Sequence, residues 1–132
     1  MLSRRAKYTI RAMQELATLK PGETLQATEL AERIKGPLHF LEGILLELRR
    51  EGWLQSKRSG GYALNKPADM ISMADIIRLI DGPLALTSCA SRTAYARCDD
   101  CPTPDDCQLR VILLAARDAV AKVLEESTLA KP

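Results

Sequence analysis

Two short helical segments and a glycine-tipped hairpin follow one another between residues 28 and 64, and this order restricts the fold more than any other feature. Thr28 is a candidate N-cap for a helix over TELAERI. Lys35-Gly36-Pro37 breaks that helix, and Pro37 suits the first turn of a second helix that extends to Arg50. Two helices joined by a short turn that contains glycine form a helix-turn-helix pattern. The apolar residues that we expect on the inward face of the second helix are Leu38, Leu41, Ile44, Leu45 and Leu48.

The hairpin comes directly after the second helix. The segments WLQS (53–56) and YAL (62–64) have the composition of strands, and Lys57 to Gly61 forms the turn between them. Glycine at the tip permits positive φ and a close approach to a phosphate or a groove floor. A further short strand is expected over Leu25 to Ala27. A basic hairpin in this place is a wing, so the pattern predicts a winged helix-turn-helix.

Further helices flank this unit on both sides. Apolar residues at helical spacing predict a helix from Ser3 to Leu19, which Pro21-Gly22 stops. After the hairpin, Ser72 is a candidate N-cap for a helix that ends at Asp81-Gly82-Pro83. The expected fold class is therefore mainly α with a small β-wing.

Charge is unevenly distributed along the chain. Residues 1–66 hold 12 Lys/Arg and 7 Asp/Glu, a balance of +5, whereas residues 67–132 hold 7 and 10, a balance of −3. A basic half favours a polyanionic partner. The sole histidine lies inside the second helix, which leaves no acid–base constellation and argues against an enzyme.

No segment has the composition of a secretory signal or a membrane helix. The residues after Met1 and Leu2 are polar or basic, and no apolar run approaches the roughly 20 residues that a membrane helix needs. We therefore expect a cytoplasmic protein with no membrane partner. Thiols stay reduced there, so cysteine is more often a metal ligand or a redox group than a structural staple.

Candidate DNA contacts lie at the start of the second helix and at the hairpin tip. Arg58 is well placed to enter a minor groove, where narrow A·T tracts concentrate negative potential. His39 lies in the first turn of the helix, the end that meets base edges. Phe40 could contact a thymine methyl group, and Glu42 could accept from cytosine N4. The full set of candidates is Arg4, Arg5, Pro37, His39, Phe40, Glu42, Arg58 and Ser59.

Ordinary structural interpretations compete with these contacts. The N-terminal arginines, His39 and Arg58 could simply be solvated surface residues. Phe40 could pack in the core, and Glu42 could form a surface salt bridge. A chain in which all of these interpretations hold would be a protein-interaction module without DNA binding.

All four cysteines fall within 19 residues, in the spacing C-x8-C-x2-C-x5-C, as Cys89, Cys98, Cys101 and Cys107. Thiolates are soft ligands that suit tetrahedral zinc or an iron–sulfur cluster. The aspartates around them oppose a free thiolate but not one bound to a cation. A redox disulfide such as Cys98–Cys101, or inert thiols, are the alternatives that stay open.

An amphipathic helix is expected from Leu109 to Glu126, with Asp105 or Asp106 as its N-cap and Cys107 in its first turn. Residues at spacings of four and three predict a coiled-coil seam of Leu109, Leu113, Ala116, Val120 and Val123. The opposite side carries Arg110, Arg117, Asp118, Lys122, Glu125 and Glu126. A dimer helix, antiparallel or crossed, is the favoured interpretation, and packing against its own domain is the alternative.

From Lys7 to Ala130 the chain resembles the bacterial Rrf-two family of winged-helix regulators, which includes IscR and NsrR. The matching segments are KYTIRAM, ELAERI, FLEGILLELRREGWL, SKRSGGYAL, ISMADIIRLIDGPLAL, the cysteines and STLA. The resemblance implies a homodimeric transcription factor that binds double-stranded operator DNA, with the helix from Leu38 to Arg50 in the major groove. It also implies that the cysteine loop holds a 2Fe–2S or 4Fe–4S cluster, through which redox state, iron or nitric oxide tunes DNA affinity.

Three ligands of the family carry over to Cys89, Cys101 and Cys107. In members that resemble IscR, a histidine follows the third cysteine after two residues, but Arg110 stands there and cannot ligate a metal. Cys98 is additional and could substitute. The turn around Arg58 is two residues shorter than is usual in the family. A regulator that uses its cysteines for zinc or for a thiol/disulfide switch is the alternative.

These expectations divide the chain into three parts. Residues 1–82 would form the winged helix-turn-helix DNA-binding domain, and residues 83–107 the cysteine-rich cluster loop. Residues 108–132 would form the dimerisation helix and the C-terminal tail.

Overall fold

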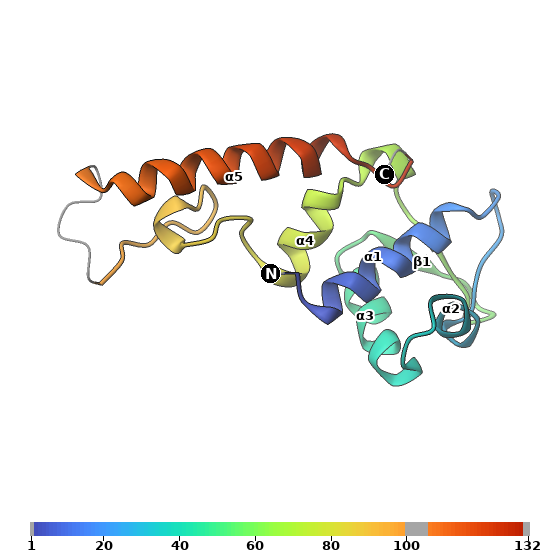
Figure 1. Cartoon of the computed structure of the whole chain (residues 1–132). Coiled ribbons are helices and arrows are strands. Elements are labelled where there is room, and N and C mark those ends of the chain that lie inside the picture. Colours follow the sequence, from blue (N-terminus) through green and yellow to red (C-terminus); the bar gives the residue numbers. More distant parts are fainter. Residues whose placement is uncertain (1, 100–105, 131–132) are drawn as a thin grey trace.

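Five α-helices and a two-stranded antiparallel sheet make up the computed structural model over the residues that it describes, 2–99 and 106–130. The elements are α1 (Arg4–Ala17), α2 (Ala27–Ile34), α3 (Leu38–Arg50), β1 (Leu54–Ser56), β2 (Tyr62–Leu64), α4 (Met73–Asp81) and α5 (Gln108–Glu126), with 3-10 turns η1 (Ala68–Met70) and η2 (Ser88–Ala90). In Figure 1, α5 runs along one side of the molecule, and α2 and the hairpin lie at the far end from the start of α5. The expected mainly α fold with a small wing is confirmed.

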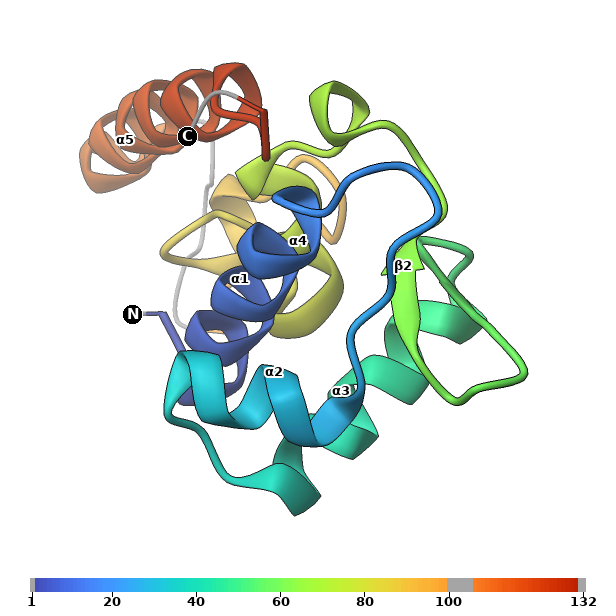
Figure 2. The ribbon, with the colours of Figure 1, turned by 90° about the vertical axis from the view of Figure 1, so that its right-hand side faces the viewer.

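One aliphatic core joins the first four helices to the hairpin. Met13 and Leu16 of α1 and Leu30 of α2 are fully buried in it, together with Leu41, Ile44, Leu45 and Leu48 of α3. Leu38, which we expected on the same face, is 37% exposed. The reason is that it begins α3, whose first turn projects below the other helices in Figure 2.

The N-terminal helix is tied to α4 at its first turn. Ser3 is the N-cap of α1, and its Oγ accepts a hydrogen bond from the Ala6 amide at 3.0 Å. The amide of Ser3 donates to Asp81 Oδ2 at 2.9 Å, and its hydroxyl donates to the other carboxylate oxygen. Because Asp81 is the last residue of α4, one serine caps one helix and joins it to the end of another.

The N-cap of α2 is Gln26, and the prediction of Thr28 is wrong. Gln26 has extended backbone angles (φ −72°, ψ 155°), and its amide donates to Glu29 Oε1 at 3.1 Å. Thr28 already lies inside the first helical turn. A glutamate three residues after the cap satisfies the backbone amide that would otherwise lack a partner, which moves the start of the helix upstream.

The wing is a short hairpin with a third chain segment beside it. Leu54 pairs with Leu64, and Ser56 pairs with Tyr62. The expected strand over Leu25 to Ala27 is reduced to a single antiparallel bridge between Leu25 and Tyr62, because α2 begins at Ala27. Figure 2 shows the hairpin at one side of α3, with α2 in front of that helix.

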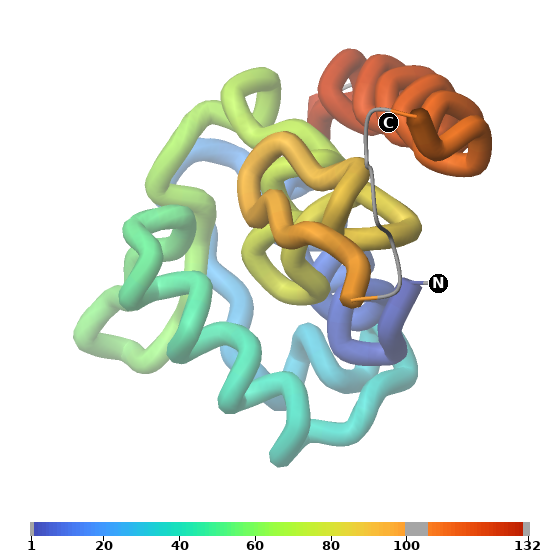
Figure 3. Tube along the Cα trace, turned by 90° about the vertical axis from the view of Figure 1, so that its left-hand side faces the viewer, coloured from blue at the N-terminus to red at the C-terminus, as the bar shows by residue number. Residues whose placement is uncertain are grey.

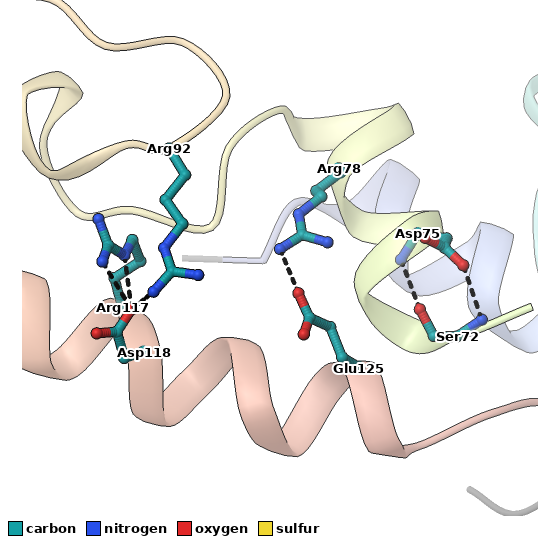
Figure 4. Close-up of polar contacts among 7 residues, drawn as sticks. All are labelled: Ser72, Asp75, Arg78, Arg92, Arg117, Asp118 and Glu125. Carbon is teal, nitrogen blue, oxygen red and sulfur yellow. Dashed lines mark hydrogen bonds and ion pairs between the residues drawn. The ribbon is translucent and has the colours of Figure 1, made fainter.

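The start of α4 and the end of α5 meet at the surface. Ser72 caps α4 as expected, and it exchanges hydrogen bonds with Asp75 (Figure 4). Arg78 of α4 forms an ion pair with Glu125 of α5 at 2.8 Å. Beyond α5, the amide of Leu129 donates to the Ile71 carbonyl at 3.0 Å, so the chain end returns to the core.

Candidate nucleic-acid interface and cysteine segment

The first turn of α3 presents several of the predicted DNA contacts on its surface. His39 and Glu42 are exposed, and Pro37 is the exposed N-cap of the helix. Gly43 follows them on the surface, with no atom within 4 Å of the position that a Cβ would take. This side of α3 is therefore free for a partner to approach closely.

Arg4, Pro37 and Phe40 meet although they come from different helices. Together with Tyr8 they line a cavity of about 300 Å³ between α1 and the start of α3. The rings of Tyr8 and Phe40 lie edge to face, with centroids 5.9 Å apart. Phe40 is nevertheless 39% exposed, so its ring packs on one side and stays accessible on the other.

Arg5 does not join this group, because it forms an ion pair with Glu47 of α3. Its guanidinium therefore links α1 to the last turn of α3, a role that the sequence did not indicate. A charge that is already paired contributes less to the attraction of a polyanion than a free one. Among the two N-terminal arginines, Arg4 is the better placed for a phosphate.

The tip of the wing is exposed and has a defined backbone. Arg58 and Ser59 are both exposed. The Lys57 amide donates to the Gly61 carbonyl at 2.9 Å, and the Gly60 amide donates to the Lys57 carbonyl at 2.8 Å. Gly60 has a φ of +89°, which only glycine adopts without strain. The Ser59 carbonyl accepts from the side chain of Gln26, a residue that sequence reasoning did not select.

The segment that holds Cys89 and Cys98, and the start of α5, lie at the end of the molecule away from the wing (Figure 1). Cys89 is buried in η2, whereas Cys98 and Cys107 are half-buried. Cys101 lies outside the described residues. Cys107 is the N-cap of α5 and makes no side-chain cap hydrogen bond, so the prediction of Asp106 as the cap is wrong, and Asp105 is not among the described residues. Figure 3 shows the segment up to residue 99 folded beside α4, with α5 to one side.

The environment of Cys89 favours its thiolate. Thr87 Oγ1 lies 3.1 Å from Cys89 Sγ, and this hydrogen bond is the largest cause of a lowered pKa of the thiol. Burial acts in the opposite direction and raises that pKa. A hydrogen bond from Cys98 and the charge of Arg110 lower it further. The thiols of Cys89 and Cys98 are therefore neighbours.

The donor set suits an iron–sulfur cluster in its chemistry, because sulfur ligands dominate in such sites. Within residues 2–99 and 106–130, however, no three Cys, His, Asp or Glu side chains are gathered closely enough to hold a metal ion. Cys107 is separated from the Cys89–Cys98 pair in this arrangement. Ligation by all the predicted cysteines would bring the start of α5 closer to that pair.

Two arginines of α5 hold the backbone around Cys89. Arg110 Nε donates to the Cys89 carbonyl at 3.1 Å, and Arg117 Nη1 donates to the Ala90 carbonyl at 2.8 Å. Asp118 Oδ1 lies 2.7 Å from Arg92 of the segment and from Arg117 (Figure 4). We call these four side chains, Arg92, Arg110, Arg117 and Asp118, the clasp.

One residue of the clasp, Arg110, could be singled out from the sequence. Arg110 stands where the family resemblance implies a ligating histidine, so this position departs from the expected pattern. The hydrogen bond from Arg117 lowers the pKa of Asp118, and burial opposes this effect. Arg117 and Asp118 were both expected on the polar side of the helix, opposite the seam. Helical periodicity does not show which residues of a polar side pack against the rest of the chain.

The helices in the described residues include none that is both long enough and apolar enough to cross a membrane.

Comparison with known proteins identifies the relatives of this chain. A family model described as Rrf2, iron-dependent transcriptional regulator, matches residues 2–131. A protein of Rhodobacter capsulatus described as an rrf2-like HTH-type transcriptional regulator is 37% identical over 150 residues, which cover 96% of this chain and 100% of the relative. A protein of Mycobacterium tuberculosis described as an HTH-type transcriptional regulator is 37% identical over 132 residues, covering 98% of this chain and 78% of the relative.

Solved structures agree with the sequence relatives. CymR, the global cysteine regulator of B. subtilis, superposes with a TM-score of 0.79 at 29% identity, covering 98% of this chain and 92% of its own. IscR of T. potens superposes with a TM-score of 0.76 at 24% identity over 99% of this chain and 84% of its own, a likeness of fold. The named relatives are regulators rather than enzymes. This chain belongs to the Rrf2 (Rrf-two) family of transcriptional regulators.

Proposed function

We propose that the protein is a dimeric regulator in which the first turn of α3 reads the major groove of operator DNA and the wing enters the adjacent minor groove. The observation that carries the DNA contact is the exposure of His39, Glu42 and Gly43 on one projecting helix end. Arg4 beside Pro37 and Phe40 would bind the flanking phosphate. Arg58 would supply the minor-groove contact.

The proposed dimer forms through the outer side of α5. Leu109, Ile112, Val120 and Val123 are between 46% and 65% exposed there, and we call them the exposed stripe. Leu113 and Ala116, which were expected in the same seam, are half-buried. Apolar side chains in such a row are commonly covered by a partner, and a second copy would present the same row.

We further propose that an iron–sulfur cluster controls operator affinity. Cys89, Cys101 and Cys107 would hold it, with Cys98 as the fourth ligand, because Arg110 cannot ligate and Cys98 already neighbours Cys89. A cluster bound there adds soft metal–thiolate bonds that depend on redox state and on iron. Three residues of the clasp lie in α5, and Cys107 is the N-cap of that helix. Binding or loss of a cluster at the cysteines would therefore move the dimer helix.

This control is a linkage between two equilibria. A shift of α5 changes the spacing and tilt of the two α3 helices, and operators with two half-sites are sensitive to that spacing. The cysteine state changes DNA affinity only by its differential free energy in the two arrangements. A difference of about 1–3 kcal/mol would change affinity by factors of about 5 to 150.

A thiol switch is the second candidate, and the Cys89–Cys98 pair favours it. The Thr87 hydroxyl lowers the pKa of Cys89, and a lowered pKa is typical of thiols that react with oxidants. A zinc site with the same four cysteines would have the same ligands, but its metal ion would not change oxidation state.

The deciding experiment is purification without oxygen, followed by an absorption spectrum and analysis for iron, sulfide and zinc. The cluster proposal expects a coloured protein whose colour is lost in Cys89→Ser and in Cys98→Ser. A colourless protein with no iron, even after reconstitution, contradicts it. Stoichiometric zinc would favour the zinc alternative.

DNA binding is tested separately by electrophoretic shifts with the protein's own promoter region at several salt concentrations. Arg58→Ala should weaken binding, whereas Lys122→Ala, which removes the same charge from the exposed side of α5, should change it little. Absence of salt-sensitive binding to any DNA would contradict the proposal.

A further inference from the structure

A single side chain joins the tip of the wing to the start of α2. Gln26 Nε2 donates to the Ser59 carbonyl at 2.7 Å, across 33 positions of sequence. The same residue is the N-cap of α2, and its amide donates to Glu29. Because the helix fixes the backbone of Gln26, its side chain ties the hairpin to a helix terminus, and we call this hydrogen bond the anchor.

The hairpin is fitted closely around this anchor. A Cβ on Gly60 would lie 3.1 Å from Gln26 Oε1, and a Cβ on Gly61 would overlap the hydroxyl of Thr24. Beside them, Leu25 and Tyr62 exchange backbone hydrogen bonds of 3.0 and 2.8 Å. Residues 24–26 therefore contact the hairpin from Ser59 to Tyr62.

Arg58 is the residue next to this attachment. It precedes Ser59, whose carbonyl is bound by Gln26, and it follows Lys57, whose amide and carbonyl are both used inside the turn. An isolated two-stranded hairpin with strands of three residues is at best marginally stable in water. The position of the Arg58 backbone is thus fixed largely by contacts that the hairpin makes with the α1–α2 connection.

We propose that Gln26 is a positioning residue for the wing, and that its hydrogen bond to Ser59 sets how deeply Arg58 reaches into the minor groove. This inference rests on the proposed DNA contact of Arg58. A hairpin that is already held in place loses less conformational entropy when it binds DNA, so the anchor raises the affinity for DNA. It also raises selectivity, because an arginine at fixed depth distinguishes a narrow A·T groove from a wider one.

The test uses Gln26→Ser, Arg58→Ala and the double variant. Serine caps helices well but is too short to reach Ser59, so Gln26→Ser removes the anchor and keeps the cap. A binding sequence is first selected from a random pool of duplexes with the wild-type protein, and the base pairs whose footprint is lost in Arg58→Ala are identified. The probes are two versions of this sequence, with either A·T or G·C pairs at those positions. Hydrogen exchange of the Lys57 and Gly60 amides reports the wing in the free protein.

We expect Arg58→Ala to weaken binding to the A·T duplex about tenfold and Gln26→Ser about threefold. The double variant should bind no more weakly than Arg58→Ala alone, and Gln26→Ser should lose part of the preference for A·T over G·C. Exchange of the two wing amides should be faster in Gln26→Ser, with the thermal midpoint nearly unchanged.

Three outcomes would overturn the inference. Unchanged wing exchange in Gln26→Ser would show that the anchor does not hold the hairpin. Losses that add in the double variant, in a protein that binds DNA, would show that Gln26 acts independently of Arg58. A wild-type protein without salt-sensitive DNA binding would overturn the proposed function and this role together.

Discussion

Arg117 donates from Nη1 to the carbonyl oxygen of Ala90 at 2.8 Å, which places a charged group of the long helix directly on the segment that holds Cys89. The side chain of Arg117 is only 14% exposed, and it also contacts Asp118. A hydrogen bond from an ionised donor in such surroundings is stronger than one at an open surface. The clasp therefore joins the cysteine segment directly to α5.

Arg117→Ala should loosen this connection. We expect it to lower the free energy of unfolding by about 1–2 kcal/mol, because it leaves the Ala90 carbonyl without its donor. Arg117→Lys should lose less stability, because an ammonium group can still bond either the Ala90 carbonyl or Asp118. It lacks the planar array of donors with which arginine bonds both. Urea unfolding of the three proteins measures the differences. Equal stability of wild type and Arg117→Ala would contradict the role of the clasp.

Acid should weaken a second contact of the clasp, the ion pairs of Asp118 with Arg92 and Arg117. The hydrogen bond from Arg117 lowers the pKa of this carboxyl in the folded protein. A lowered folded-state pKa gives a contribution that is fully present above the unfolded pKa of about 3.9 and is lost as the pH falls through the lower folded value. Thermal midpoints of wild type and Asp118→Asn should differ at neutral pH and converge in acid, once the pH has fallen through the lowered folded-state pKa of Asp118. A difference that persists in acid would show that Asp118 does not act through its charge.

The wing and the cap of α4 were predictable because their signals are local. Glycines between two short β-rich segments, and Ser72 three residues before Asp75, describe structures that form within a few residues. Gln26 gave no such signal, since its amide finds Ser59 only after the chain has folded. The clasp was missed for a related reason. Periodicity groups Arg117 with Asp118 on one side of α5, but packing decides whether that side meets solvent or the cysteine segment.

Gly61 should be far less tolerant of substitution than Gly43. A Cβ at Gly61 would overlap Thr24, whereas at Gly43 it would meet nothing within 4 Å. Gly61→Ala should therefore destabilise the protein by about 1–3 kcal/mol through the forced shift of the hairpin. Gly43→Ala should stabilise it by about 0.5–1 kcal/mol, because alanine favours the interior of a helix.

The Gly43→Ala variant also reports on the DNA contact. If α3 lies in the major groove, the methyl group of Gly43→Ala meets the duplex, so this variant should bind the promoter fragment more weakly although it is more stable. Chemical denaturation and electrophoretic shifts on one preparation separate the two effects. A more stable variant with unchanged DNA affinity would place Gly43 outside the interface.

The dimer can be tested with two neighbouring residues of α5. Ile112 and Val111 are both β-branched and almost equally exposed, at 65% and 63%. Successive residues of a helix differ by about 100° in direction, so only Ile112 belongs to the exposed stripe. Ile112→Glu should dissociate the dimer, because a carboxylate buried between two apolar rows is not solvated. Sedimentation should then give the monomer mass, and operator affinity should fall because the two half-sites are no longer bound by one linked dimer.

The control is Val111→Glu, which adds the same charge one position away and should remain a dimer with wild-type affinity. Equal sedimentation of both variants, whether as dimers or as monomers, would show that the exposed stripe is not the subunit contact.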